Sequence, residues 1–333
     1  MRRPSRAPRR RVCRPAPQLD SPLFFDARNA FAFAIVWDKS TLKQSVLERT
    51  SDGGATWHAT PMSPAIHGDL TFFDSNHGWL VSAQDSADHL STTETLWRTS
   101  DGGMTWSSTY SYAYRLDVHP STQPGGCYWQ GSIAWSSATN GIVGVSCPFD
   151  SPPAVDVTRD GGSTWVREAL PPLAGPNGIS LYSITGPVHI FANGEELALV
   201  SRCVGPDGTS CTPYAELYRT HDGGASWSQG EMFRGGALGL LTSDWAHAWM
   251  SDGCLDPCLS FGMLRTADGG VHWQVLPLRT ELQPNMHGSR IYSFVTPDLG
   301  FVTSSNEFQQ RTSYYRTNDA GRTFMAFQPL LEA

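Results

Sequence analysis

The sequence lacks long apolar runs. Its 333 residues contain no apolar stretch of about twenty residues, the length that a membrane-spanning helix requires. The first twenty residues have no apolar core of the kind found in export signals. Apolar residues also do not recur at helical intervals over any extended segment. The sequence therefore predicts neither a transmembrane segment nor a helical bundle.

Positive charge is scarce outside the first twenty residues. Residues 1–20 contain seven Arg and one Asp, whereas the remainder has 17 basic and 30 acidic residues, a net charge of -13. A strongly acidic body argues against nucleic-acid binding. The segment 1–20 is rich in Arg and Pro and is predicted to be disordered, which leaves residues 21–333 as the folded domain.

What the sequence has in abundance is internal repetition. The segment "RTSDGGATW", which ends at Trp57, recurs with variations five more times. The repeated aspartates are Asp52, Asp101, Asp160, Asp222, Asp268 and Asp319. Their spacing of 46 to 62 residues indicates one structural unit with insertions of variable length, as in repeat architectures.

Each unit is predicted to contain four antiparallel strands. In the second unit, short β-branched and aromatic runs occur at 70–73, 79–82, 93–99 and 104–109, and turn residues separate them. Four-stranded units repeated about an axis are the blades of a β-propeller. We therefore expect an all-β fold, a single propeller with six blades between residues 21 and 329. Seven blades are the alternative.

The repeated residue types suit a tight turn between the third and fourth strands. The Asp carboxylate is expected to accept hydrogen bonds from backbone N–H groups two or three residues on. The second Gly permits a positive φ, and the closing aromatic residue is expected to be buried. A calcium loop would need several acidic ligands, and each copy offers one. We therefore expect no metal and no cofactor at these turns.

The pattern Thr/Ser-x-Asp-x-Gly-x-Thr-Trp resembles the Asp-box (BNR) repeat of sialidases and related propellers. With "FFD…GW" ahead of "RTSDGGMTW", the whole unit resembles the photosystem II assembly and stability factor family and its bacterial relatives. The resemblance covers nearly everything after residue 20. It implies a propeller fold and is weakly specific for function, because Asp boxes in these families stabilise turns away from the binding face.

Six of the seven cysteines form three neighbouring pairs. Local pairing predicts the disulfides Cys127–Cys147, Cys203–Cys211 and Cys254–Cys258. The alternative is a zinc site built from the last four of these cysteines, although only the final pair has the usual ligand spacing. Disulfides imply an extracytoplasmic location, either periplasmic or secreted. Because no export signal is visible, we expect the true start to lie upstream.

Three functional classes are compatible with such a fold. We expect a monomeric, non-catalytic binding or assembly propeller that presents the loops of one face to a protein or glycan partner. The alternative is a sialidase-like glycoside hydrolase. As a family, sialidases use three arginines, a Tyr/Glu nucleophile pair and an acid/base Asp, but their Arg-Ile-Pro signature is missing here. Nothing in the sequence selects three among the possible arginines Arg115, Arg202, Arg234 and Arg279. A xyloglucan-cleaving hydrolase would need two facing propellers.

The longest decorated connection, residues 107–131, is our candidate binding loop. Tyr, Trp and Arg dominate binding hot spots because they bury a large area and keep a polar group. The candidate residues are Tyr110, Tyr112, Tyr114, Arg115, Tyr128 and Trp129. The alternative is that the alternating tyrosines extend the fourth strand of the second unit.

Five arginines precede the repeated turns, and we expect them to serve the repeat by stacking on aromatic rings rather than to form one site. They are Arg49, Arg98, Arg219, Arg265 and Arg316. The scattered histidines lack ligand spacing.

Overall fold

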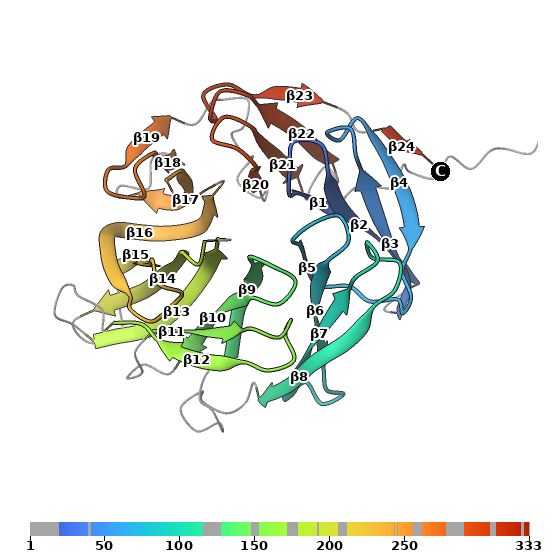
Figure 1. Cartoon of the computed structure of the whole chain (residues 1–333), viewed down its shortest axis with the longest axis horizontal. Coiled ribbons are helices and arrows are strands. Elements are labelled where there is room, and N and C mark those ends of the chain that lie inside the picture. Colours follow the sequence, from blue (N-terminus) through green and yellow to red (C-terminus); the bar gives the residue numbers. More distant parts are fainter. Residues whose placement is uncertain are drawn as a thin grey trace, which may run out of the picture.

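The computed structural model is a six-bladed β-propeller with four antiparallel strands in each blade (Figure 1). It describes residues 20–38, 41–115, 128–147, 153–171, 179–191, 193–205, 212–242, 244, 246–255, 262–277, 290–306, 311–327 and 330–332, and these contain no helix. The predicted fold class is therefore confirmed with six blades, not seven. Residues 1–19, the predicted disordered segment, lie outside the described part.

The first three blades are formed in chain order from the centre outwards. Blade 1 contains β1 (Asp20–Phe24), β2 (Ala30–Asp38), β3 (Thr41–Thr50) and β4 (Thr56–Pro61). Blade 2 contains β5 (Asp69–Phe72), β6 (Gly78–Asp85), β7 (Ser91–Thr99) and β8 (Ser107–Arg115). Blade 3 contains β9 (Tyr128–Trp135), β10 (Gly141–Cys147), β11 (Ala154–Thr158) and β12 (Val166–Ala169).

The other three blades follow the same order, with one strand shared. Blade 4 contains β13 (Ile179–Ile190), β14 (Glu196–Gly205), β15 (Thr212–Thr220) and the first part of β16 (Ser228–Thr242). Blade 5 contains the second part of β16, β17 (Ala248–Leu255), β18 (Gly262–Thr266) and β19 (Gln274–Pro277). Blade 6 contains β20 (Arg290–Phe294), β21 (Gly300–Asn306), β22 (Arg311–Thr317) and β23 (Met325–Phe327).

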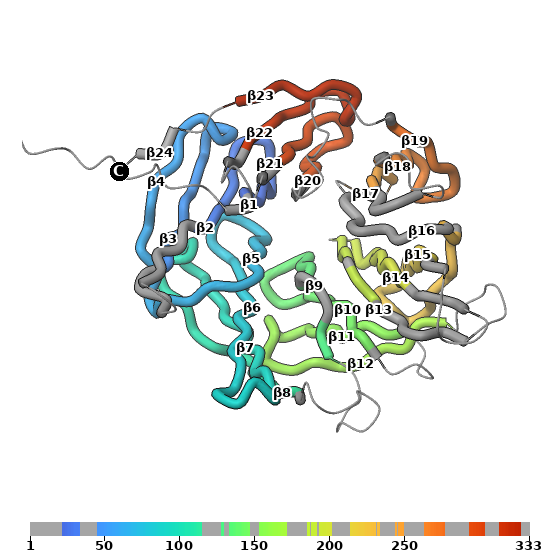
Figure 2. The backbone as a smooth tube through the Cα atoms, turned by 180° about the vertical axis from the view of Figure 1, so that it is seen from behind, coloured from blue at the N-terminus to red at the C-terminus, as the bar shows by residue number. Residues whose placement is uncertain are grey.

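A further strand extends blade 1. Strand β24 (Leu330–Glu332) pairs in parallel with β4 on its outer edge, so a segment that follows blade 6 in the chain joins the first blade (Figure 1). The view from behind shows the blades arranged in a ring (Figure 2). The last blade is thereby tied to the first, which closes the ring.

Apolar side chains fill all six interfaces between adjacent blades. Each of six buried clusters draws its members from two neighbouring blades, including a cluster that joins blade 6 to blade 1 through Phe301 and Phe24. Aromatic rings of second strands stack on first-strand rings of the next blade; for example, the Trp79 and Trp135 centroids are 3.6 Å apart. Burial of such rings provides the main driving force for blade packing.

The ends of the strands define two faces of the disc. Connections between the first and second strands and between the third and fourth strands emerge on one face, which we call the turn face. The remaining connections emerge on the opposite face, which we call the loop face. Among the described residues, no helix is long and apolar enough to cross a membrane.

Candidate functional site

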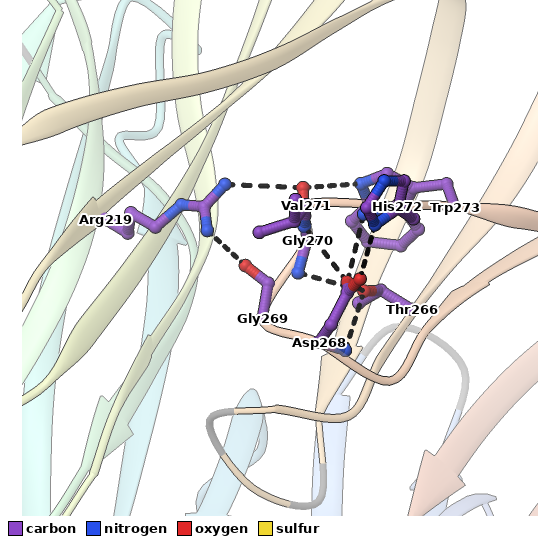
Figure 3. A network of polar contacts seen from close by, with 8 residues as sticks. All are labelled: Arg219, Thr266, Asp268, Gly269, Gly270, Val271, His272 and Trp273. Carbon is purple, nitrogen blue, oxygen red and sulfur yellow. Dashed lines mark hydrogen bonds and ion pairs between the residues drawn. The ribbon is translucent and has the colours of Figure 1, made fainter.

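The repeated aspartates organise six turns on the turn face. In blade 5, the Thr266 hydroxyl donates to Asp268 (2.8 Å), and the Gly270 N–H donates to the same hydroxyl (2.9 Å) (Figure 3). The Asp268 carboxylate also accepts from the backbone N–H of Val271 and His272 (3.1 and 3.0 Å). Every blade repeats the bond from Thr to Asp. These carboxylates are occupied by their own turns.

The bonding pattern differs from the expected one in its spacing. We expected donors two or three residues after each Asp, but the donor common to all six turns is the N–H four residues on, such as Thr56 to Asp52 at 2.9 Å. The N–H two residues after each Asp donates instead to the hydroxyl of the threonine two residues before it, as from Gly54 to Thr50. The carboxylate therefore accepts from N–H groups further along the chain. The side chain and N–H of Thr56 lower the pKa of Asp52 to about 2.

Four of the five repeat arginines contact the next blade or an aromatic ring. Arg219 donates to the carbonyl oxygens of Gly269 and Gly270 in the turn of blade 5 (Figure 3). The guanidinium groups of three others lie 5.9 Å from ring centroids, in the pairs Arg98–Trp79, Arg265–Trp249 and Arg316–Phe301. These contacts agree with a role in the repeat.

The candidate binding tyrosines lie on a strand, not in a loop. Strand β8 continues to Arg115, and Tyr110, Tyr112 and Tyr114 alternate along the face that packs against blade 3. The Tyr110 ring stacks on Trp129 and the Tyr114 ring stacks on Tyr128, with centroids 5.4 and 5.3 Å apart. The alternative that these tyrosines extend the fourth strand is therefore correct. Residues 116–127 and the Arg115 side chain lie outside the described structure.

The structure adds two carboxylates that the sequence analysis missed. Glu94 lies opposite Tyr112 in the β7–β8 register, and the Tyr112 hydroxyl donates to Glu94 Oε2 at 2.6 Å. The Tyr114 hydroxyl is 3.4 Å from Glu94 Oε1. On β5, Asp69 is in register with Val81, which pairs with Leu96, two residues beyond Glu94 on the same face of the sheet. Both acids therefore lie on one face of blade 2, in the half toward the loop face.

Desolvation dominates the electrostatics of this pair. Burial raises the pKa of Glu94 and outweighs the opposing hydrogen bonds from the two tyrosines, and the neighbouring Asp69 charge raises it further. Asp69 has an open surface, yet the surrounding protein displaces water from its carboxyl group and raises its pKa also. Two acids with raised pKa values beside each other favour a state with one proton on the pair.

A polar network continues from this pair into blade 3. The Trp129 N–H donates to the Tyr112 hydroxyl at 3.0 Å, and the Trp129 indole N–H donates to Asp156 Oδ2 at 2.9 Å. Arg167 donates to both oxygens of Asp156, at 2.8 and 3.0 Å. Tyr112 and Trp129 are thus held from both sides, so Glu94 has a defined position.

No sequence pattern identified Glu94 as a functional candidate. It stands in the segment "TTET", and only the register of β7 with β8 brings it to Tyr112. The available signal was the alternation of Tyr110, Tyr112 and Tyr114, which identified the same interface.

Several predicted residues fall outside the described structure. Cys127, Cys211 and Cys258 are not described, and the side chains of Cys147, Cys203 and Cys254 are not described either, so the disulfides stay predictions. The same applies to the possible loop-face arginines Arg202, Arg234 and Arg279. Within the described residues, no group of three or more His, Cys, Asp or Glu side chains could hold a metal ion.

No known family model matches the sequence, and no curated protein matches it either. Solved structures do share the fold. An α-L-arabinofuranosidase from Fusarium graminearum, solved with an iminosugar inhibitor, has a TM-score of 0.58 at 13% identity, covering 91% of this chain and 93% of that one. An α-L-arabinanase from Penicillium chrysogenum, solved with arabinobiose, has a TM-score of 0.55 at 12% identity, covering 91% and 99%. An ulvan lyase, a polysaccharide lyase, has a TM-score of 0.51 at 8% identity, covering 92% and 82%.

These similarities overturn the expectation of a non-catalytic binding or assembly propeller. The neighbouring structures include two glycoside-cleaving enzymes and a polysaccharide lyase, which favour the glycosidase alternative. They also show that this chain has the propeller fold shared with glycoside hydrolases. At these identities the likeness is one of fold, so the activity must be argued from the chain's own residues.

Proposed function

We propose that this protein is a glycoside-cleaving enzyme whose catalytic acids are Glu94 and Asp69. The observation that carries the proposal is the pair of carboxyl groups on one face of blade 2, both with raised pKa values. Glycoside hydrolysis generally needs two such groups, one protonated and one ionised.

The two environments suggest separate roles. Glu94 is held by Tyr112 and is less exposed than Asp69, so it serves as the proton donor to the departing sugar oxygen. Asp69 is open to solvent on the innermost strand, and its carboxylate stabilises positive charge at the anomeric carbon or activates a water molecule. The wall of Tyr114 and Tyr128 offers half-buried aromatic faces on which a sugar ring can stack.

The Tyr112 hydroxyl does not serve as a nucleophile in this proposal. Burial and the Glu94 charge both raise its pKa, and its oxygen already accepts the Trp129 N–H. An ionised phenolate is therefore disfavoured at this position. Tyr112 instead positions Glu94.

The test is hydrolysis of a panel of 4-nitrophenyl glycosides, including the α-L-arabinofuranoside that the similar structures suggest, with arabinan and sialosides added. We expect turnover of at least one substrate, a loss of about 10²-fold or more in kcat for Glu94→Gln and for Asp69→Asn, and little change for Glu195→Gln. Glu195 pairs with His221 on the turn face and serves as a matched control. Activity that survives both substitutions would refute the assignment of these acids.

We also propose that the protein acts outside the cytoplasm. The support is the arrangement of cysteines in neighbouring pairs, which suits local disulfides. Peptide mapping of the unreduced protein by mass spectrometry should find the three local bridges. Free thiols with bound zinc would contradict both the pairing and the location.

A further inference from the structure

A cavity lies on the turn face, between blades 1 and 2, remote from the loop face. Its volume is about 280 Å³, and its walls include Phe25, Phe31, Arg49, Ser51, His58 and Ser75. Ser75 belongs to the turn after β5, and the other residues come from blade 1. Nothing in the proposed glycoside chemistry uses this cavity.

Three of its side chains form one row across blade 1. Phe31 on β2 is in register with Arg49 on β3, and Arg49 is in register with His58 on β4. Paired residues of antiparallel strands share a face of the sheet, so the aromatic ring, the guanidinium and the imidazole all face blade 2. The Phe25 ring stacks on Phe31, with centroids 5.6 Å apart, and adds a half-buried apolar wall.

The Arg49 guanidinium has no hydrogen-bond or carboxylate partner in the described part of the chain. At the corresponding position of blade 4, Arg219 donates to two carbonyl oxygens of the next turn. Arg49 reaches the same turn in blade 2, where a Cβ on Gly102 would lie 3.1 Å from its Nη1, but it makes no such bond. Its donors are therefore available to a ligand.

His58 is specific to this blade. It follows the closing aromatic residue of the first repeat, and none of the other copies has a histidine there; the equivalents are Ser107, Val166, Ser228, Gln274 and Met325. The repeat does not require an imidazole at this position. Among the described residues, those that line the cavity include no acidic side chain, so they do not neutralise the charge that Arg49 contributes.

We propose that this cavity binds a small organic carboxylate with a flat apolar body. The planar guanidinium of Arg49 matches a carboxylate in a two-point contact, and Ser51 and Ser75 offer further polar contacts at the rim. The half-buried ring of Phe25, backed by the buried ring of Phe31, receives the apolar body. A small, partly open cavity of this kind suits a ligand of modest size and weak affinity.

The experiment is calorimetric titration of the full chain with benzoate, with neutral benzamide and with inorganic phosphate. We expect benzoate to bind with a Kd on the order of 1 mM, and benzamide and phosphate to bind at least tenfold more weakly. Arg49→Gln should weaken benzoate binding at least tenfold. Arg98→Gln changes the same repeat position in blade 2 and does not line the cavity, so it should leave binding unchanged.

A second variant keeps the test decisive if Arg49→Gln fails to fold. Ser75→Phe fills the cavity from an exposed turn without removing charge, and it should abolish benzoate binding at an unchanged melting temperature. The proposal is wrong if benzoate does not bind, if benzamide or phosphate binds as tightly, or if folded Arg49→Gln or Ser75→Phe retains the wild-type affinity.

Discussion

At the scale of single residues, Tyr112 opposes the rise in the pKa of Glu94. Its hydroxyl donates to the carboxylate at 2.6 Å and accepts the Trp129 N–H at 3.0 Å. This hydrogen bond stabilises the ionised form of Glu94 and so opposes the effect of burial on the pKa of Glu94. One phenol therefore limits how far the carboxyl pKa rises and ties blade 2 to blade 3.

Replacing Tyr112 with Phe should change both properties. Without the donor, the pKa of Glu94 rises further, so the basic limb of the pH–activity profile should move to higher pH. The buried Trp129 N–H loses its acceptor, which should cost about 1–3 kcal/mol of unfolding free energy. A pH–kcat/KM profile and urea denaturation measure the two effects.

Tyr110→Phe is the matched control for that experiment. Tyr110 packs in the same row of rings, and its hydroxyl makes no hydrogen bond within the described residues. Its replacement should leave the pH profile unchanged. An equal shift in both variants would show that general packing, and not the bond to Glu94, sets the profile.

The sequence predicts the turn residues well and the candidate catalytic pair poorly, for a physical reason. The bonds of an Asp-Gly turn join residues at most four positions apart, so a nine-residue segment contains the information. In the sequence, Glu94 is 18 residues away from Tyr112 and 25 residues away from Asp69. Their proximity in space depends on strand register, which a single sequence does not determine.

At the scale of elements, stacked aromatic rings join successive blades. Trp79 on β6 is fully buried, stacks on Trp135 of β9 at 3.6 Å and donates to the Gly161 carbonyl at 3.2 Å. Phe31 and Phe72 make the equivalent stack between blades 1 and 2. Phe72 and Trp79 of the "FFD…GW" segment thus serve contacts between units, while the closing Trp packs over its own turn, as the bond from Trp57 to Gly54 shows.

Trp79→Ala should reduce the free energy of unfolding by about 3–5 kcal/mol, because it removes a buried ring and leaves a cavity between two blades. Urea denaturation followed by fluorescence measures the change. Phe73→Ala, at a ring that is 39% exposed beside the same sheet, should cost under about 1 kcal/mol. Similar losses in both variants would contradict a special role for the stack.

The sequence predicts that the strands exist better than it predicts where they begin and end. The sequence predicts a connection over residues 107–131, yet β8 extends to Arg115 and β9 begins at Tyr128. The tyrosines of β8 carry enough polar character to resemble an exposed loop. Only their alternation, which fits a strand with one face against blade 3, indicates otherwise.

At the scale of the whole molecule, one interface departs from the repeat. Between blades 3 and 4 the repeat arginine is replaced by Val157. The carboxylates of Glu168 and Glu196 occupy this interface, and each has a buried oxygen without a hydrogen-bond partner among the described residues. Arg159 lies 3.7 Å from Glu168, and its charge opposes the rise in the pKa of both acids. Burial, followed by the Glu168 charge, raises the pKa of Glu196 to about 7.

This interface predicts that stability falls as pH rises. The pKa of Glu196 is higher in the folded state than its ordinary 4.5, so the folded state binds the proton more tightly. Its contribution is complete below pH 4.5 and is lost as pH rises to about 7, with a magnitude on the order of 3 kcal/mol. Glu196→Gln should flatten this part of the curve of melting temperature against pH.

The control variant for this prediction changes the residue next to Glu196 in the sequence. Glu195→Gln changes the adjacent, partly exposed carboxyl, which pairs with His221, and should leave the slope between pH 4.5 and 7 intact. A wild-type protein whose melting temperature is constant over that range would refute the assignment. The stability that the Asp-Gly turns contribute is lost in a separate pH range, below about pH 4, because the pKa values of Asp52 and Asp160 are lowered to about 2.

The shared strand β16 has a consequence for protein engineering. It leaves blade 4 at Arg234 and enters blade 5 at Gly235 without a connecting loop, so one continuous backbone belongs to both blades. New chain ends placed there by circular permutation would cut a hydrogen-bonded strand in two sheets at once. The boundary between β4 and β5 has a connecting segment, and the ring could be reopened there with far less damage.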